Sequence, residues 1–205
     1  MKKIPLYLAS SNRGKFVEIE AVLKKAQLPF ELFSSDAAGG MPAVDENAPD
    51  YLGNARLKAE ALRKVLPGDA WFLAEDSGLE VDALDGAPGV YTARYGSPGS
   101  SSSDKCAQLL AELGGHPDAA RTARFVCVMV LLAKANVYSF HGECSGILAR
   151  SLSGEQGFGY DPIFIPEGYT ETLAELGPRV KNTISHRARA LESLSAELSS
   201  LSKPQ

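Results

Sequence analysis

The chain has 205 residues, and 21 lysines and arginines against 25 aspartates and glutamates give it a formal net charge of −4. This length predicts one domain, residues 1–205, and the mild acidity disfavours a general nucleic-acid binder, which needs a basic surface. No apolar run approaches the roughly 18 residues of a membrane span. Three cysteines without ligand spacing, Cys106, Cys127 and Cys144, indicate buried thiols in a reducing cytoplasm rather than disulfides or a zinc site.

Strand and helix patterns alternate along the chain, which predicts an α/β fold with a mixed sheet. Apolar residues at both parities of 124–134 are typical of a strand buried on both faces, and a partner strand from Asn136 predicts a hairpin. The stretch 151–184 is interpreted as irregular chain rich in glycine and proline. The predicted elements are strand 3–9, helix 16–26, strand 30–34, helix 50–66, strands 71–74 and 79–83 around a turn at 75–78, helix 104–113 with Asp104 as its cap, strands 124–134 and 136–150, and helix 185–201, with a frayed tail from about 202.

A polar loop, Ser10–Lys15, joins the first predicted strand to the first predicted helix. Backbone N–H groups at a helix start and the ammonium of Lys15 favour an anion, so this loop is a candidate phosphate site. It is not a P-loop, because Ala9 and Phe16 stand where that motif needs glycine and serine or threonine. The alternative is an ordinary connection in which Asn12 caps the helix.

Two adjacent acids, Glu75 and Asp76, follow an apolar segment. Adjacent residues of a strand point to opposite faces, so the two carboxylates need not share a site. One of them, joined by Glu46 from the acidic loop, is a candidate ligand pair for Mg²⁺, which prefers oxygen donors. The alternative is a solvated turn.

A glycine-rich motif, GFGYDP at residues 157–162, is a candidate pocket for a base. Phe158 offers a face for stacking, and Asp161 is a candidate acceptor for a ring N–H group. Such aromatic–glycine runs are also common as plain turns.

Cationic side chains gather where a loop enters the last predicted helix, within KNTISHRARAL. Lys181, His186 and Arg187 lie beside Ser185, the expected N-cap. Cations at a helix start oppose the helix dipole, which suggests an anion or an acceptor supplied from elsewhere. The alternative is a solvated basic turn.

Five blocks, LASSNRGK, DENAPDYLGNARLKA, EDSGLEVDALDGAPGVYTARY, GFGYDPIF and KNTISHRARAL, follow one another between about residues 8 and 191. With these blocks the chain closely resembles the inosine triphosphate pyrophosphatase family, enzymes that remove non-canonical purine nucleotides. The resemblance implies an elongated mixed β-sheet with flanking helices, two lobes around a central nucleotide cleft, and a homodimer. It also implies Mg²⁺-dependent hydrolysis of ITP, dITP or XTP to the monophosphate and pyrophosphate.

The resemblance assigns roles to individual positions. Asp76 is expected to be the general base and, together with Glu46, a ligand of the metal. Lys58 is expected to contact phosphate, and Ser77 to contact substrate. The other expected substrate-binding residues are Ser10, Ser11, Asn12, Arg13, Gly14 and Lys15 along the triphosphate, Phe158, Gly159, Tyr160 and Asp161 around the base and sugar, and Lys181, His186 and Arg187 in the base pocket.

The sequence departs from the family pattern at a few positions. Ser10 and Ser11 stand where threonine and glycine are usual, and Glu75 stands where aspartate is common. Gly53 replaces the glutamate of the usual ENA triplet, which removes one possible carboxylate from the metal site. We expect Glu46 and Asp76 to suffice, with water completing the shell of ligands.

Two alternative functions remain open from the sequence. The first is a nucleotide-binding or regulatory module without turnover, which the glycine at position 53 favours. The second is a Maf-like nucleotide pyrophosphatase of different base specificity, against which the SHR and FGYD blocks argue.

Overall fold

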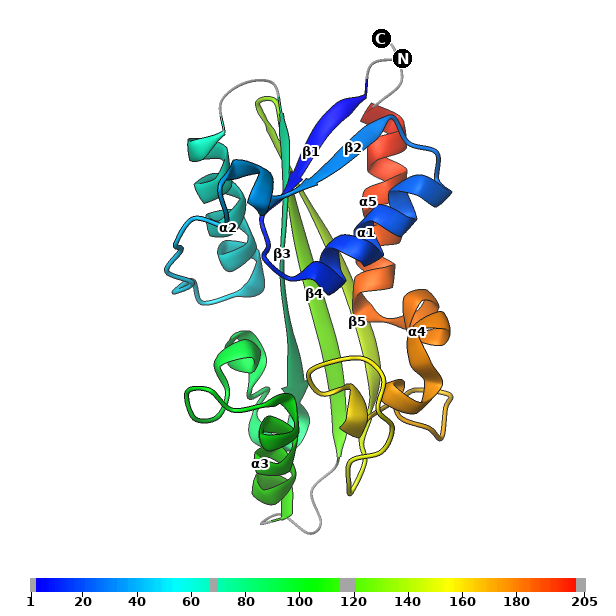
Figure 1. Ribbon diagram of the computed structural model, residues 1–205. Coiled ribbons are helices and arrows are strands. Elements are labelled where there is room, and N and C mark those ends of the chain that lie inside the picture. Colours follow the sequence, from blue (N-terminus) through cyan, green and yellow to red (C-terminus); the bar gives the residue numbers. More distant parts are fainter. Residues whose placement is uncertain (1–2, 67–69, 115–120, 202–205) are drawn as a thin grey trace. The chain divides into compact units, whose positions relative to one another are not determined.

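The computed structural model describes residues 3–66, 70–114 and 121–201 (Figure 1). Within these residues the strands form one sheet in the order β2-β1-β3-β4-β5-β6, in which β1 is parallel to β2 and β3, and β6 is antiparallel to β5. This mixed sheet with helices beside it confirms the predicted α/β fold class. The elements are β1 (Ile4–Leu8), α1 (Arg13–Lys25), β2 (Phe30–Ser34), α2 (Tyr51–Val65), β3 (Trp71–Val81), α3 (Ser102–Gly114), β4 (Thr122–Ala133), β5 (Asn136–Leu148), β6 (Phe164–Pro166), α4 (Leu173–Ile184) and α5 (His186–Leu201).

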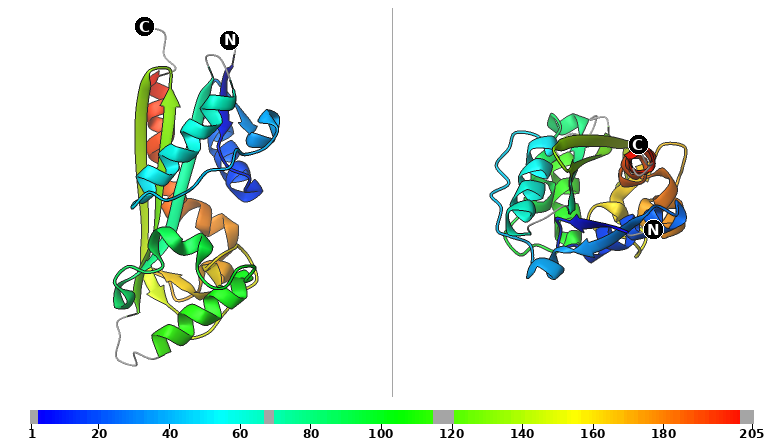
Figure 2. Two further views of the ribbon diagram at one scale, coloured as in Figure 1. Left: turned by 90° about the vertical axis from the view of Figure 1, so that its left-hand side faces the viewer. Right: turned by 90° about the horizontal axis from the view of Figure 1, so that it is seen from above.

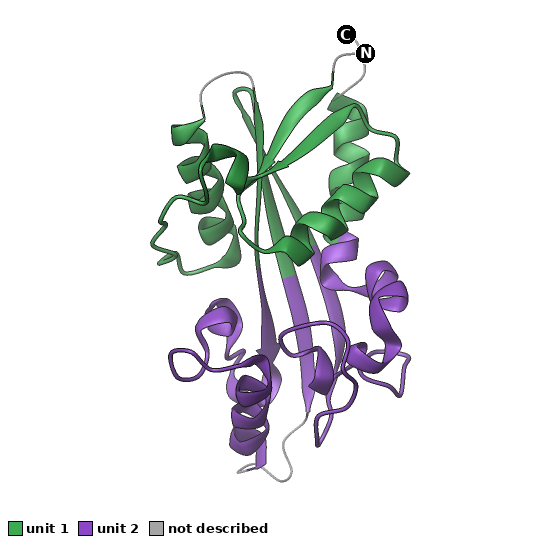
Figure 3. Ribbon diagram, in the orientation of Figure 1, with its two compact units in different colours: residues 1–76, 127–141, 190–205 green, residues 77–126, 142–189 purple. Residues whose placement is uncertain are grey.

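The chain divides into two compact units (Figure 3). Unit 1 contains the described residues up to Asp76, together with Cys127–His141 and those from Ala190 onward. Unit 2 contains the described residues of 77–126 and 142–189. Strands β3, β4 and β5 therefore contribute residues to both units. Among the described residues, two hydrophobic cores lie in unit 1 and one lies in unit 2.

In unit 1, helices cover both faces of the sheet. Trp71 and Leu73 of β3 pack into a core with residues of α1 and α5, whereas Phe72 and Ala74 pack into a second core with residues of α2. Figure 2 shows α2 on one side of these strands, with α1 and α5 on the other. Residues of β4 alternate between the same two cores, so the prediction of a strand buried on both faces is confirmed.

In unit 2, α3 packs its apolar face, with Leu109 and Leu113, into a core that includes residues of β3, β4 and β5. This helix was expected, but it begins at Ser102 because Ser101 and Asp104 exchange hydrogen bonds there. The Ser101 hydroxyl accepts from the Asp104 N–H at 3.2 Å, and the Asp104 carboxylate accepts from the Ser101 N–H at 2.9 Å. Asp104 therefore lies inside the first turn and does not precede it.

Two predictions of secondary structure are wrong. Residues 75–78 form no turn, because β3 runs without interruption from Trp71 to Val81. The second error concerns 151–184, where the strand β6 and the helix α4 replace part of the expected irregular chain. The N-cap of α4, Thr172, forms a capping box with Glu175, while Gly177, with φ of 71°, interrupts the helix in its middle.

The three cysteines all lie within the described residues, where they are buried and form no disulfide, as predicted. Among the described helices, none has both the length and the apolar composition needed to cross a bilayer. The tail from residue 202, which the sequence predicts to be frayed, lies outside the described residues.

Candidate active site

Strand β3 delivers its two adjacent acids to opposite faces of the sheet. Glu75 has the parity of Trp71 and Leu73, which pack with α1, and Asp76 has the parity of residues that pack with α2. Both acids are buried, at 2% and 9% exposure. The prediction that they need not share a site is confirmed, and each acid meets a lysine from the helix on its own side.

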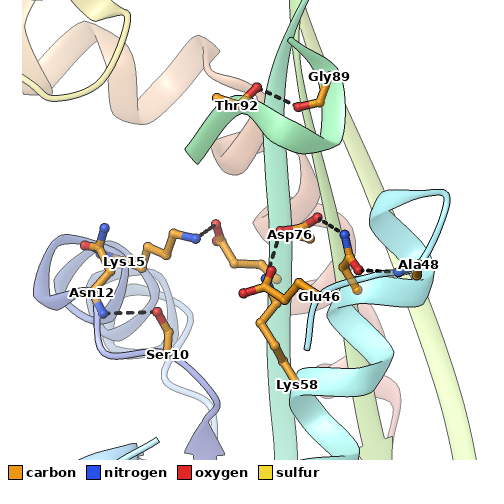
Figure 4. Close-up of polar contacts among 11 residues, drawn as sticks. Ser10, Asn12, Lys15, Glu46, Ala48, Lys58, Asp76, Gly89 and Thr92 are labelled. Carbon is orange, nitrogen blue, oxygen red and sulfur yellow. Dashed lines mark hydrogen bonds and ion pairs between the residues drawn. The ribbon is translucent and has the colours of Figure 1, made fainter. Parts of the chain in front are cut away.

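On the α1 side, Lys15 forms an ion pair with Glu75, with 2.9 Å between Nζ and Oε1 (Figure 4). Lys15 lies in the first turn of α1, which begins after the N-cap Asn12. The Asn12 side chain accepts hydrogen bonds from the N–H groups of Gly14 and Lys15 at 2.9 and 3.2 Å, and the Ser10 hydroxyl accepts from the N–H of Asn12 at 3.1 Å. Asn12 is thus the helix cap, and two of the expected phosphate-binding N–H groups already donate to it.

On the α2 side, Lys58 lies between two carboxylates of unit 1. Its Nζ is 2.8 Å from Asp76 Oδ1 and 2.9 Å from Glu46 Oε2 (Figure 4). One turn earlier on α2, Asn54 donates from Nδ2 to the other oxygen of Asp76 at 3.3 Å. The structure therefore brings together Glu46 and Asp76, the two expected metal ligands. Between them it places Lys58, which was expected to contact phosphate, and it adds Asn54.

Asn54 also connects the acidic loop to α2. Its Oδ1 accepts from the backbone N–H of Ala48 at 3.0 Å, which fixes the orientation of the amide toward Asp76. Sequence reasoning missed this residue. Its position four residues before Lys58, and so on the same face of a helix, was the available signal.

Gly53 is explained by a close approach between this loop and the first turn of α2. A Cβ atom at position 53 would lie 2.5 Å from the Cβ of Ala48 and 3.1 Å from Oδ1 of Asp50, the N-cap. Asp50 also accepts the N–H of Gly53 at 2.7 Å. The glycine thus allows the loop that carries Glu46 to pack directly on α2, where a glutamate does not fit without movement of Ala48.

The Gly53→Glu variant is therefore expected to lower the free energy of unfolding by about 1–3 kcal/mol, the usual cost of overpacking. Helix propensity and the helix dipole act in the opposite direction, since both favour glutamate over glycine in a first turn. Urea unfolding measures the change. Leu52→Glu is the matched control, because Leu52 is exposed on the same turn. If the Gly53→Glu protein is as stable as the native chain, the loop that contains Ala48 moves away from α2 without a cost in free energy.

The electrostatics of this site are set by burial and by close opposite charges. Burial raises the pKa of Asp76 above its ordinary value, although Lys58 and Asn54 oppose this shift. Burial lowers the pKa of Lys58, but Asp76 and Glu46 outweigh it and raise that pKa overall, so the ammonium stays charged. On the α2 side one lysine, Lys58, faces the two carboxylates of Glu46 and Asp76, so these three side chains together carry one net negative charge.

Such a set of oxygen donors fits a hard divalent cation. The carboxylates of Glu46 and Asp76 already bind one cation between them, the ammonium of Lys58. A metal ion would be bound by the same two carboxylates through the same attraction of opposite charges. A site with net negative charge repels a triphosphate, and a bound divalent cation reverses that sign. The described residues contain no group of three or more metal-ligating side chains, so the two carboxylates fit the implied metal only as a pair of ligands with water as the others.

In unit 2, several residues expected to bind the base lie in contact around Asp161. Its Oδ2 accepts from the N–H of Phe158 at 2.8 Å and from Nζ of Lys181 at 2.6 Å. The Lys181 ammonium lies 4.0 Å from the centre of the Phe158 ring, and the guanidinium carbon of Arg187 lies 5.6 Å from it. Asp161, Lys181 and Arg187 are buried, whereas Phe158 is 42% exposed. Asp161 thus holds a partly exposed ring over two buried cations.

The remaining predicted positions of unit 2 have the following places in the structure. His186 is buried and stacks on Phe125, with 4.8 Å between ring centres. Ser185 accepts from the N–H of Ala188 at 3.2 Å, which confirms it as the cap of α5. Tyr160 is buried, Gly159 takes the left-handed conformation with φ of 64°, and Ser77 follows Asp76 on β3.

The fold is that of Ham1 proteins of known structure. The chain superposes on a HAM1 protein from Coxiella burnetii with a TM-score of 0.88 and 34% identity, covering 96% of this chain and 99% of that one. A Ham1 protein from Staphylococcus aureus superposes with a TM-score of 0.84 and 36% identity, covering 96% of this chain and 99% of that one. The model of the Ham1 family matches residues 6–197, and the chain belongs to this family.

Curated relatives with similar sequences carry the name dITP/XTP pyrophosphatase. One from Opitutus terrae is 47% identical over 90% of this chain and 94% of its own length. Another from Bdellovibrio bacteriovorus is 40% identical over 94% of this chain and 96% of its own length. The resemblance to nucleoside triphosphate pyrophosphatases is confirmed.

Proposed function

We propose that this chain hydrolyses non-canonical purine nucleoside triphosphates (ITP, dITP and XTP) to the monophosphate and pyrophosphate. The observation that carries the proposal is the buried carboxylate of Asp76, which Lys58 and Asn54 hold from α2 while Lys15 pairs with its neighbour Glu75. The names of the relatives supply the substrate class. The activity would remove altered purines from the nucleotide pool.

Magnesium is the proposed cofactor, held by Glu46 and Asp76. When bound, it supplies charge that offsets the phosphate oxygens. The net negative charge of the metal-free site is the physical reason for this dependence, since a triphosphate is repelled until a divalent cation is added.

The proposed chemistry is attack of water on the α-phosphorus, with the bond to the bridging oxygen of pyrophosphate breaking. Asp76 accepts the proton of that water, and its burial raises its pKa toward the range that suits a general base. Lys15 and Lys58 balance the charge that develops on the leaving pyrophosphate. The polar residues Ser10, Ser11, Asn12, Arg13 and Gly14 are proposed to line the triphosphate, with Ser77 as a further contact.

Base recognition is proposed for the group around Asp161. Phe158 stacks on the purine, because its side chain is partly exposed and can offer a ring face to the base. A 6-keto purine offers an acceptor at O6 and a donor at N1, and adenine reverses both. Donors such as Arg187 favour the keto form and leave adenine groups unsatisfied, with Gly159, Tyr160, Lys181 and His186 completing the pocket.

We further propose that the protein acts in the cytoplasm as a homodimer. Three buried cysteines that form no disulfide suit a reducing compartment. The dimer rests on the family resemblance, and sedimentation equilibrium tests it.

An assay of ITP, dITP and XTP against ATP and GTP, with Mg²⁺ and with EDTA, tests the proposed function. Pyrophosphate release from the first three, dependent on the metal, is expected. Orthophosphate would mean that a different bond is cut, and preference for a canonical nucleotide would support a Maf-like specificity. Tight binding without release would instead support a nucleotide-binding module.

A further inference from the structure

Lys58 occupies an unusual place for a residue expected to contact phosphate. Its ammonium bonds to Glu46 and to Asp76 at 2.9 and 2.8 Å, and its side chain is 13% exposed. These are the two carboxylates proposed to hold the metal. The cation that this structure shows between them is therefore supplied by the protein itself.

We propose that Lys58 is the resident counter-cation of this carboxylate pair and that a divalent cation binds there by displacing its ammonium. The proposal rests on the proposed function, because it concerns the same site. Each oxygen of Asp76 already has a donor, Lys58 at Oδ1 and Asn54 at Oδ2. An ammonium and a metal ion compete for the same oxygens, since like charges at such separations repel strongly.

Displacement has a cost that a phosphate can relieve. An ammonium that is removed from its carboxylates in a largely buried place has lost the partners that compensate its desolvation. A phosphate anion bound nearby supplies new partners for it. Metal and phosphate are therefore coupled through Lys58, and each strengthens the binding of the other by the same factor. The lysine limits metal binding in the absence of nucleotide and becomes a phosphate ligand when both arrive.

Titration of the nucleotide-free protein with Mn²⁺ tests this proposal, because Mn²⁺ takes the same oxygen donors as Mg²⁺. The Lys58→Met variant is expected to bind Mn²⁺ at least about tenfold more tightly than the native chain, since the competing charge is gone. Lys24→Met is the matched control. It removes the same charge from an exposed i,i+4 pair with Glu20 in the same unit, and its affinity should stay within about twofold of native. Equal or weaker binding by Lys58→Met overturns the proposal.

A second variant separates charge from shape. Lys58→Arg keeps the positive charge and should keep the weak affinity of the native chain. In EDTA, Lys58→Met should melt at a lower temperature than the native protein, because two carboxylates lose their counter-cation, and Mn²⁺ should raise its melting temperature by more. If Lys58→Met does not fold, Lys58→Gln is titrated in its place with the same expectation.

The outcomes also distinguish this proposal from the proposed function. A native chain that releases no pyrophosphate, combined with tighter Mn²⁺ binding by Lys58→Met, rejects the activity and retains the displacement. An active native chain whose Mn²⁺ affinity is unchanged by Lys58→Met rejects the displacement alone.

Discussion

The Asp76→Asn variant is expected to lower kcat for ITP by about 10³-fold, within the range that general-base catalysis contributes. Asparagine keeps the size of aspartate and still offers an oxygen to Lys58, but it cannot take a proton from water. Lys15, Lys58 and the group around Phe158 remain in place, so the variant should still bind ITP. Steady-state pyrophosphate release and equilibrium binding of ITP to the variant measure the two effects separately.

Asp36→Asn is the matched control for this variant, because Asp36 is an exposed carboxylate of the same unit. It should leave both kcat and binding unchanged. An Asp76→Asn protein that binds ITP poorly yet turns over each bound molecule at the native rate would assign Asp76 to binding and would require another base.

Removal of the Arg187 guanidinium should reduce the preference for ITP over ATP by at least about tenfold, the scale of one hydrogen bond to a charged group. Arg187 is 1% exposed and lies beside the Phe158 ring. Water therefore competes little with a base for the hydrogen bonds of its guanidinium. Arg187→Met fills a similar volume without donors. The measurement is the ratio of kcat/KM for ITP to that for ATP.

Arg189→Met provides the comparison for this second prediction. Arg189 is on the same helix, is exposed, and donates to the carbonyl of Glu143 at 2.7 Å. Its replacement should leave the ratio unchanged. Arg187→Lys keeps one charged donor, so its ratio of kcat/KM for ITP to that for ATP should lie between the ratios of the native chain and Arg187→Met. This variant is assayed in place of Arg187→Met if the latter is too unstable. An unchanged ratio in both Arg187 variants would remove this residue from base selection.

The sequence predicted the elements whose pattern is local. Apolar residues at both parities predicted β4 correctly, and Ser185 was identified as a cap from the residues at the helix start. Asn12 was recognised as a cap only in the alternative to a phosphate site. The capping box Thr172–Glu175 was also a local signal for α4, but the glycine and proline at 177 and 178 obscured the helix. A helix interrupted in this way depends on tertiary packing for its stability, and a local sequence pattern does not predict tertiary packing.

Burial of charge was the part of the site that the sequence could not predict. Residues 75–78, two acids followed by serine and glycine, resembled a turn because serine and glycine are common in turns. Glutamate and aspartate in the middle of a strand are also costly without partners. Their partners, Lys15 and Lys58, are 60 and 18 positions away in the chain, and only the fold brings them together. Gly53 was read as a lost carboxylate for the same reason, since its close contact with Ala48 exists only after α2 and the loop have packed.

The parity of β3 has a consequence for changes in chain length. One residue inserted within Trp71–Ala74 would move the glutamate to the position that faces Lys58. The aspartate would change to the face of Lys15 but would lie about 6.6 Å along the strand from the position that pairs with this lysine. Two inserted residues would restore the faces but advance both acids by about 6.6 Å along the strand, beyond the reach of either lysine. Insertions and deletions within Trp71–Ala74 are therefore expected to inactivate the protein even where each substitution in the same segment is tolerated.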